Sequence, residues 1–287
     1  MALSPVPLVR RPHFDFGSQA VGGNVGGEGG EGIGRHWFGG SALRTHLANG
    51  LNFVFPEGER FFIRSVRHYA DRLDPELKVR VAALAGQEAQ HQRAHLASFE
   101  LLEAQGYEVA SWLAWYESVG YRRIEPRVPP VLRLATTAAL EHFTATFGEL
   151  VLRTEMLDTA HPTMRALLRW HAAEEIEHRD VAYDVLLVVD PRWAVRALGF
   201  VMAGGLLAFF WSSGVRHLRR QDPPRGAVER AAGQQVRTYW RRHGPAFARA
   251  LLAYLRPGFH PRDAGGDALA EAFFAEGTAG EHGPVAT

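Results

Sequence analysis

The chain has 287 residues, of which 46% are hydrophobic and 22% are charged, and its formal net charge is +1 at pH 7. A chain of this length can bury a sizeable core, and a charge so near neutral gives no general attraction for nucleic acid. Cysteine is absent, which excludes disulfides, thiolate zinc sites and iron–sulfur clusters. The N-terminus has no apolar signal region, so we expect a cytoplasmic protein. From the near-neutral charge we expect no nucleic-acid partner.

Glycine is concentrated near the N-terminus, between Gly17 and Gly40. So many glycines make a regular element costly, and we expect residues 1–45 to be extended or disordered. The first helix is expected to begin at Pro56, because proline suits the first turn of a helix, and to end at about Leu73.

A second helix is expected to follow almost at once. Asp74 is a suitable N-cap, Pro75 suits the first helical position, and the helix should end at about Gln105, before Gly106. So short a connection makes the first two helices antiparallel neighbours. A long crossover, residues 106–128, comes next and is rich in aromatic residues: Trp112, Trp115, Tyr116 and Tyr121.

Two further helices complete a predicted bundle. The third is expected over about Val131–Leu157 and the fourth over about Thr163–Val189, separated by the breaking pair His161-Pro162. The connections are therefore short, long and short, which is the order of a ferritin-like bundle. We predict an all-α fold, a ferritin-like four-helix bundle with additional C-terminal helices.

The C-terminal part begins with an apolar stretch, Ala197–Val215, that contains no charged residue. Its length allows a membrane span, but its glycines and serines also suit a helix that is buried against the bundle. We favour the buried helix, lining an apolar channel, and keep peripheral membrane contact as the alternative. A last amphipathic helix is expected over about Ala227–Leu255. The expected divisions are an N-terminal segment at 1–45, the bundle at 46–190, a helical cover at 191–262 and a loose tail at 263–287.

Two segments carry the pattern Glu-x-x-His: Glu88 to His91, and Glu175 to His178. At ~100° per residue, the Glu and His of each segment lie within about 60° of each other on one helix face. One such pattern occurs often by chance on an amphipathic helix, as a solvated pair. Two patterns on separate helices of one bundle are much harder to obtain by accident.

Four-helix proteins that hold two metal ions take a Glu-x-x-His from each of two helices and one Glu from each of the others. Glu59 and Glu141 lie on the two remaining predicted helices. Glu57 competes with Glu59, but it lies at the helix start, where a carboxylate simply complements the helix dipole. Buried carboxylates close together are unfavourable unless cations neutralise them, so the pattern predicts a dinuclear metal site.

His171 lies four residues before Glu175, about 40° away on the same helix face. Its position fits a metal ligand and equally a core or solvated histidine. Glu174 or His142 could hydrogen-bond a ligand imidazole, and His95 either lines the cavity or faces solvent. The candidate metal ligands are Glu59, Glu88, His91, Glu141, His171, Glu175 and His178.

Several of these segments resemble a family of bacterial proteins catalogued as predicted metal-dependent hydrolases. The resemblance covers roughly residues 8–262 and is carried by four segments: Phe55–Phe62, Gln87–His91, His171–His178 and Pro257–Pro261. The spacing His-x3-Glu-x2-His, with one Glu-x-x-His upstream, also resembles the diiron arylamine N-oxygenases. That resemblance implies a ferritin-like site with the seven ligands named above, but the rest of the chain departs from those enzymes.

We therefore expect a non-haem dinuclear enzyme with two iron ions, manganese and zinc being the alternative metals. The expected activity is O₂-dependent oxidation of a small hydrophobic organic substrate. No segment reads as a nucleotide, flavin or nicotinamide site, so an electron donor would be a separate protein. The first alternative is a metal-dependent hydrolase that uses an activated water. The second is a metal-binding or storage protein without an organic substrate.

Overall fold

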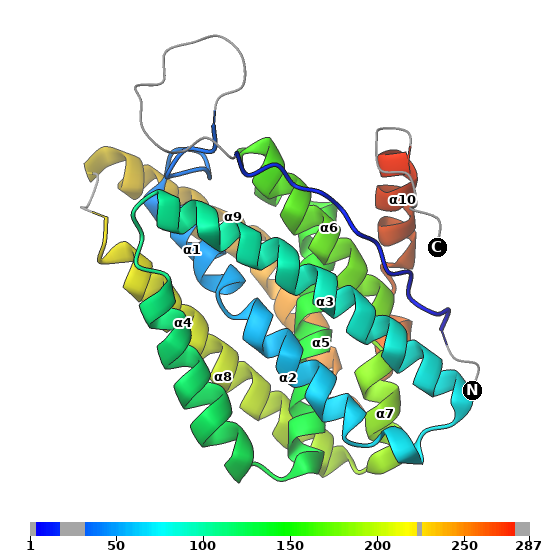
Figure 1. The fold of residues 1–287 in the computed structure, drawn as a ribbon. Coiled ribbons are helices and arrows are strands. Elements are labelled where there is room, and N and C mark those ends of the chain that lie inside the picture. The colour runs from blue at the N-terminus through cyan, green and yellow to red at the C-terminus, as the bar shows by residue number, and fades with distance from the viewer. Residues whose placement is uncertain (1–3, 18–31, 223–225, 279–287) are drawn as a thin grey trace.

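The computed structural model describes residues 4–17, 32–222 and 226–278, and its fold is all-α (Figure 1). Within those ranges the β structure is limited to one bridge, between Phe38 and Ala160. The arrangement fits a ferritin-like bundle with additional helices, as the sequence predicts. Short 3-10 turns join several helices: η1 (Ala70–Arg72), η4 (Glu155–Leu157) and η5 (Pro261–Ala264).

The bundle is built from helices that pack side by side in pairs: α2 (Phe55–Arg67), α3 (Pro75–Ala104), α5 (Pro130–Arg153), α6 (Pro162–His178) and α7 (Val181–Val189). The helix α2 packs on α3 and on α5, while α6 packs on α5 and on α3 (Figure 1). The last bundle helix continues after a break as α7, which packs on α3 and α5.

Local signals in the sequence determine most of these ends. The Asp74 side chain accepts a hydrogen bond of 2.8 Å from the backbone N–H of Leu77, and Pro75 occupies the first helical position of α3. After α3, Gly106 adopts φ of 85°, a conformation in which a side chain would be strained. Pro130 and Pro162 begin α5 and α6 in the same way.

The fourth predicted helix is broken at Arg179 and Asp180, although no proline or glycine marks the position. The Arg179 guanidinium donates hydrogen bonds to the carbonyl oxygen of Ile176 and to Asp267. The Asp180 carboxylate accepts from Arg80 at 2.6 Å. Long-range ion pairs therefore stabilise the break, and the prediction of one continuous helix is wrong at this point.

The long crossover is itself helical. It contains α4 (Ala110–Tyr116), which continues directly into the π-helix η2 (Glu117–Ile124) and then into η3 (Glu125–Arg127). Its aromatic side chains are mostly buried against the core, with Trp112 and Tyr116 only 5% and 4% exposed. The crossover therefore packs against the bundle and covers part of its apolar core.

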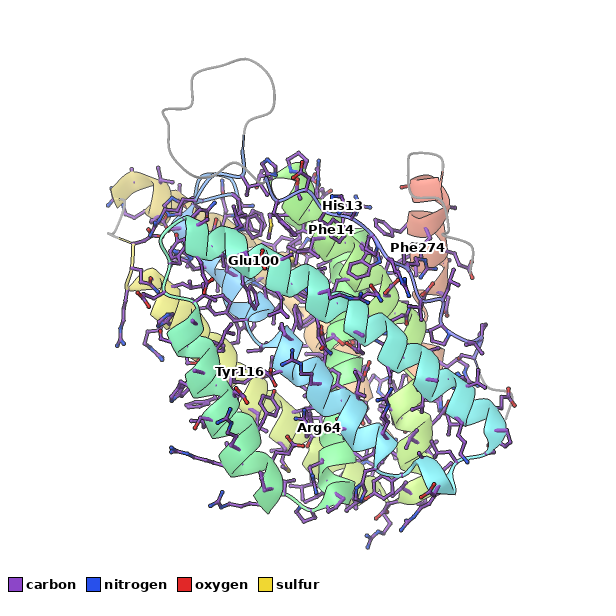
Figure 2. All side chains as sticks on the ribbon, in the orientation of Figure 1. His13, Phe14, Arg64, Glu100, Tyr116 and Phe274 are labelled. Carbon is purple, nitrogen blue, oxygen red and sulfur yellow. The ribbon has the colours of Figure 1, made fainter. Side chains whose placement is uncertain are left out.

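The N-terminal region is more ordered than the sequence suggests. An unpredicted helix, α1 (Ala42–Asn52), begins at the N-cap Ser41. Residues 4–17 have no regular structure but run along the surface near α6 (Figures 1 and 2). There Phe14 lies 5.6 Å from the ring of Trp170, and the Arg10 guanidinium lies 3.4 Å from the ring of Phe274. Most of the glycine-rich stretch, 18–31, falls outside the described residues.

The apolar stretch forms α8 (Trp193–Arg219), which packs on α5, α1 and α4. Gly199 lies against the backbone of Ala135, and Phe210 and Leu218 are buried. The other side is exposed, and only 22% of its most apolar 18-residue window is buried. The expectation of a buried helix is therefore met on one face only. By length and composition α8 could cross a membrane, but a single helix that meets these criteria is weak evidence for a membrane span.

The remaining helices are α9 (Gly226–Ala253), as predicted, and α10 (Asp267–Thr278). The helix α10 packs on α6, with Ala270 buried against Ala173 and Ile176. The prediction of a loose tail is thus wrong for 267–278, while 279–287 fall outside the described residues.

Candidate metal centre

The seven predicted ligands meet inside the bundle. They come from four helices: Glu59 from α2, Glu88 and His91 from α3, Glu141 from α5, and His171, Glu175 and His178 from α6. All seven are buried, and the most exposed, His171, retains 4% of its surface. The sequence therefore identifies a real cluster of carboxylates and imidazoles.

Two of the carboxylates lie between two histidines. Glu88 places Oε2 3.4 Å from Nδ1 of His91 and Oε1 3.5 Å from Nε2 of His178. Glu175 places Oε1 3.6 Å from Nδ1 of His91 and Oε2 3.5 Å from Nε2 of His178. Each carboxylate thus offers one oxygen to each half of the cluster, which is the arrangement that bridging ligands need.

The other ligands fall into the two halves. On the His91 side, Glu59 Oε1 lies 4.0 Å from Nδ1 of His91 and 4.0 Å from Nε2 of His171. His171 Nε2 also lies 2.7 Å from Glu175 Oε1. On the other side, Glu141 Oε2 lies 3.3 Å from Nε2 of His178. Three-residue groups from both halves have ligand atoms close enough together to hold an ion.

Many of these atoms lack a hydrogen-bond partner among the described residues. They are both oxygens of Glu59, Glu88 and Glu141, with Nδ1 of His91 and Nε2 of His178. Buried polar atoms are rarely left unsatisfied, and uncompensated buried charge is costly. Burial, together with the Glu88 charge, raises the pKa of Glu59 well above its ordinary value, and burial raises the pKa of Glu141 to about 8. Four carboxylates and three imidazoles fit two divalent cations.

Two of the imidazoles have a hydrogen-bond partner at the ring nitrogen that points away from the other candidate ligands. Nε2 of His91 lies 3.1 Å from Glu174 Oε2, while Glu174 Oε1 accepts from Arg10 at 3.2 Å. His171 Nδ1 lies 2.5 Å from Nε2 of His95, which is fully buried. Glu174 therefore contacts a candidate ligand as expected. His95 contacts the candidate ligand His171, is grouped with Glu59 and His171 as a possible ligand itself, and does not face solvent.

His142 does not take the expected place. Its Nε2 donates to the carbonyl oxygens of Ala250 and Leu251, both at 3.2 Å, and its ring stacks on Tyr254. The side chain thus joins α5 to α9. Although Glu141 precedes it in the chain, the next residue of a helix points about 100° away, so His142 points away from the candidate ligands and is buried against α9.

Two residues near the ligands were not identified from the sequence. Gln87 Oε1 lies 2.9 Å from Nδ1 of His178, and the Thr144 hydroxyl donates to Oε2 of Glu175. Gln87 immediately precedes Glu88 and belongs to the segment Gln87–His91, which resembles the metal-dependent hydrolase family. Thr144 follows Glu141 by three residues, so helix periodicity could have placed it on the ligand face.

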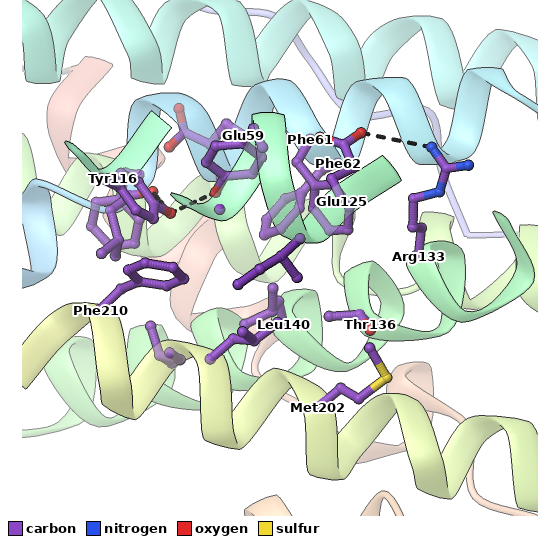
Figure 3. Close-up of a pocket in the computed structure, with 18 of the residues that line it drawn as sticks. Glu59, Phe61, Phe62, Tyr116, Glu125, Arg133, Thr136, Leu140, Met202 and Phe210 are labelled. Carbon is purple, nitrogen blue, oxygen red and sulfur yellow. Dashed lines mark hydrogen bonds and ion pairs between the residues drawn. The ribbon is translucent and has the colours of Figure 1, made fainter. Parts of the chain in front are cut away.

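A cavity of about 90 Å³ reaches the cluster from one side. Glu59, Thr144 and Glu175 line it near the metal ligands, and the rest of its wall is largely apolar. Figure 3 shows Phe61, Phe62, Leu140 and Phe210 around this space, with Met202 of α8 on the far wall from Glu59. In the same view, Arg133 and Glu125, whose nearest charged atoms are 3.9 Å apart, lie well away from Glu59. An apolar cavity therefore lies between α8 and the candidate ligands, at the place where the sequence predicts a channel.

A second group of possible ligands lies elsewhere, at His36, His46 and Asp222. Asp222 Oδ2 already accepts from His36 at 2.8 Å, from His46 at 2.6 Å and from Tyr107 at 2.7 Å. The Arg35 guanidinium contacts Oδ1 at 3.0 Å. The charge of the Asp222 carboxylate is thus compensated without a metal ion. Its hydrogen bonds join residues 35–46 and Tyr107 to the segment that follows α8.

Comparison with known proteins agrees with this centre. A family model described as "Predicted metal-dependent hydrolase" matches residues 28–265, which include all seven candidate ligands. No curated protein and no solved structure gives a significant match. The likeness to the arylamine N-oxygenases remains a resemblance of ligand spacing. The chain belongs to the family of predicted metal-dependent hydrolases.

Proposed function

We propose that this protein is a dinuclear metal-dependent hydrolase that cleaves an ester or amide bond in a hydrophobic substrate. The observation that carries the proposal is the position of Glu88 and Glu175, each with one oxygen toward His91 and the other toward His178. The family match supports the hydrolytic reaction, and the apolar cavity supports the substrate class.

The residues divide into those that would hold metal and those that would hold substrate. Glu59, His91 and His171 would hold one ion, Glu141 and His178 the other, and Glu88 and Glu175 both. Two divalent ions so held would lower the pKa of a water molecule and polarise the bond to be cleaved. Water would add across the acyl bond to give an acid and an alcohol or amine.

The cavity wall supplies orientation and excludes water. Phe61, Leu140 and Phe210 would pack on an apolar substrate group, while the reactive bond faces Glu59 and Glu175. The hydroxyl of Thr144 holds Glu175 by donating to Oε2, away from the oxygen that faces His171.

A second candidate is O₂-dependent oxidation of a hydrophobic substrate by an iron form. The buried third imidazole of His171 favours it, because donor type is a main control over the reactivity of a metal. This reaction would need an electron donor from a separate protein. Metal storage is less well supported, because storage needs no apolar cavity beside the ligands.

The two enzymatic candidates are separated by loading the metal-free protein with zinc, manganese or ferrous iron. Each form is assayed against para-nitrophenyl esters and anilides of increasing chain length, and the iron form is also exposed to air. The proposal predicts hydrolysis by the zinc or manganese form that increases with chain length. Glu88→Gln alters a candidate ligand to both ions, so it should reduce the rate by more than the about 10- to 100-fold that loss of an outer-shell partner costs.

The matched control is Glu100→Gln, which changes an exposed carboxylate on the same helix (Figure 2) and should leave the rate unchanged. If the zinc and manganese forms are inert while the iron form consumes O₂ with a transient visible absorption, oxidation replaces hydrolysis.

A further inference from the structure

The outer face of α8 is apolar and largely exposed in the part of the chain that the structure describes. Its exposed side chains recur every three or four residues, with Leu198 46%, Val201 66% and Phe209 53% exposed. Gly205, Ala208 and Ser212 are also exposed along this line. The face, defined here as residues 198–212, therefore presents about four turns of helix without a charge.

The opposite face of α8 cannot leave the bundle without cost. A Cβ at Gly199 would meet the backbone of Ala135 at 2.5 Å, and Gly214 lies against Gly50. Ala203 and Leu218 are fully buried. Close backbone contacts at two points along the helix hold it parallel to the surface of the protein, so its exposed face can lie on a membrane while the helix does not cross it.

Charge is concentrated at one end of this face. The last turns of α8 and its C-cap carry Arg216, Arg219 and Arg220, all exposed, and α8 contains no acidic residue. The indole of Trp115, from α4, lies 6.1 Å from Phe209 and is 38% exposed, which extends the apolar surface onto the crossover. A tryptophan beside an apolar helix face bounded by arginines is the pattern of a helix that lies in a lipid interface.

We propose that residues 198–212 of α8 dock this protein on an anionic lipid bilayer. The apolar face enters the boundary between head groups and acyl chains, and Arg216, Arg219 and Arg220 contact the anionic head groups.

This position has a consequence for the substrate. Met202, Leu206 and Phe210, on the inner side of the same helix, line the cavity that reaches Glu59. A docked α8 would place the cavity next to the acyl chains, so the substrate would be a molecule that partitions into the bilayer. This part alone rests on the proposed function.

The test is flotation of the intact protein with vesicles of phosphatidylcholine, with and without an equal share of phosphatidylglycerol. Wild type should float with the anionic vesicles and be released by high salt. Val201→Asp should weaken binding at least about tenfold, because it replaces an inserted apolar side chain with a repelled charge. Arg216→Gln with Arg219→Gln should weaken it by about tenfold or more.

The control is Val79→Asp, which places the same charge at a 54% exposed valine on α3 and should not change flotation. Equal flotation of Val201→Asp and wild type would overturn the proposal. So would a wild type that binds no vesicles but is a dimer that Val201→Asp makes monomeric, since the face would then be an interface between copies. Metal content and hydrolysis of a water-soluble ester by Val201→Asp separate a failure of docking from a failure of the proposed function.

Discussion

Gln87 determines which nitrogen of His178 carries hydrogen. The Gln87 amide nitrogen donates to the carbonyl oxygen of Leu8 at 3.0 Å and to Glu177 at 2.9 Å. Both are acceptors, so the amide oxygen must face His178, where it accepts from Nδ1 at 2.9 Å. The lone pair of the neutral imidazole is therefore on Nε2, which faces Glu88 and the other carboxylates.

Gln87→Leu should weaken metal binding about 10- to 100-fold, because the imidazole of His178 loses the acceptor that fixes its orientation. Competition with a chromophoric chelator measures the affinity, and circular dichroism checks the fold. Gln90→Leu, a half-buried amide on the same helix, is the control. Identical affinities in the two variants would show that Gln87 has no part in holding the ligand.

Removal of metal should destabilise the protein, because four buried carboxylates lose the charges that compensate them. With free metal at a thousand times Kd the stabilisation is about 4 kcal/mol, which for a domain of this size corresponds to roughly 10 °C in Tm. Scanning calorimetry with and without chelator measures the shift. Glu88→Gln combined with His178→Ala should abolish most of it, and a shift of wild-type size in this variant would place the metal elsewhere.

Two glycines of α8 should respond oppositely to the same substitution. Gly199→Ala places a Cβ about 2.5 Å from the backbone of Ala135 and should destabilise the fold by about 1–3 kcal/mol. Gly205→Ala meets nothing within 4 Å and should stabilise α8 by up to about 1 kcal/mol. Urea unfolding measures both, and equal effects would contradict the packing of α8 on α5.

The low pKa of Asp222 should make the free energy of unfolding decrease as the pH falls into the acid range. Burial acts to raise its pKa, but hydrogen bonds from Tyr107, His36, His46 and Arg35 outweigh burial and hold the pKa below its usual range. The unfolded chain binds a proton near pH ~4 while the folded carboxylate does not, so this stabilisation is full above that pH and is lost as pH falls through the folded pKa.

Asp222→Asn should therefore be less stable than wild type near neutral pH, and the difference should shrink below about pH 4. Urea midpoints across this range measure it, with the exposed Asp71→Asn as control. A constant difference between Asp222→Asn and wild type at every pH would contradict the assignment.

The cluster of candidate ligands could be predicted because helix periodicity brings Glu88 and His91 to one face, and because bundle geometry repeats between proteins. The missed elements depend on contacts from distant parts of the chain. The first N–H groups of α1 donate to Glu229 of α9, from Ala42 at 2.9 Å and from Leu43 at 2.8 Å. The break after His178 likewise rests on partners of Arg179 that no local pattern reveals.

His142 shows the limit of reasoning from one helix. Its neighbour Glu141 points inward, but the partners of His142 are carbonyl oxygens near the end of α9, more than a hundred residues later. Without the path of α9, the residues gave no reason to separate His142 from Glu174 as a support for a ligand. The exposed face of α8 was ambiguous for the same reason, since apolar composition does not show which side is covered.

Anomalous X-ray diffraction from crystals of the zinc- or iron-loaded protein tests the central claim most directly. We predict two ions in the core, one beside Glu59, His91 and His171 and the other beside Glu141 and His178, with Glu88 and Glu175 ligating both. A core without metal, a single ion there, or ions found only at His36, His46 and Asp222 would contradict the dinuclear centre.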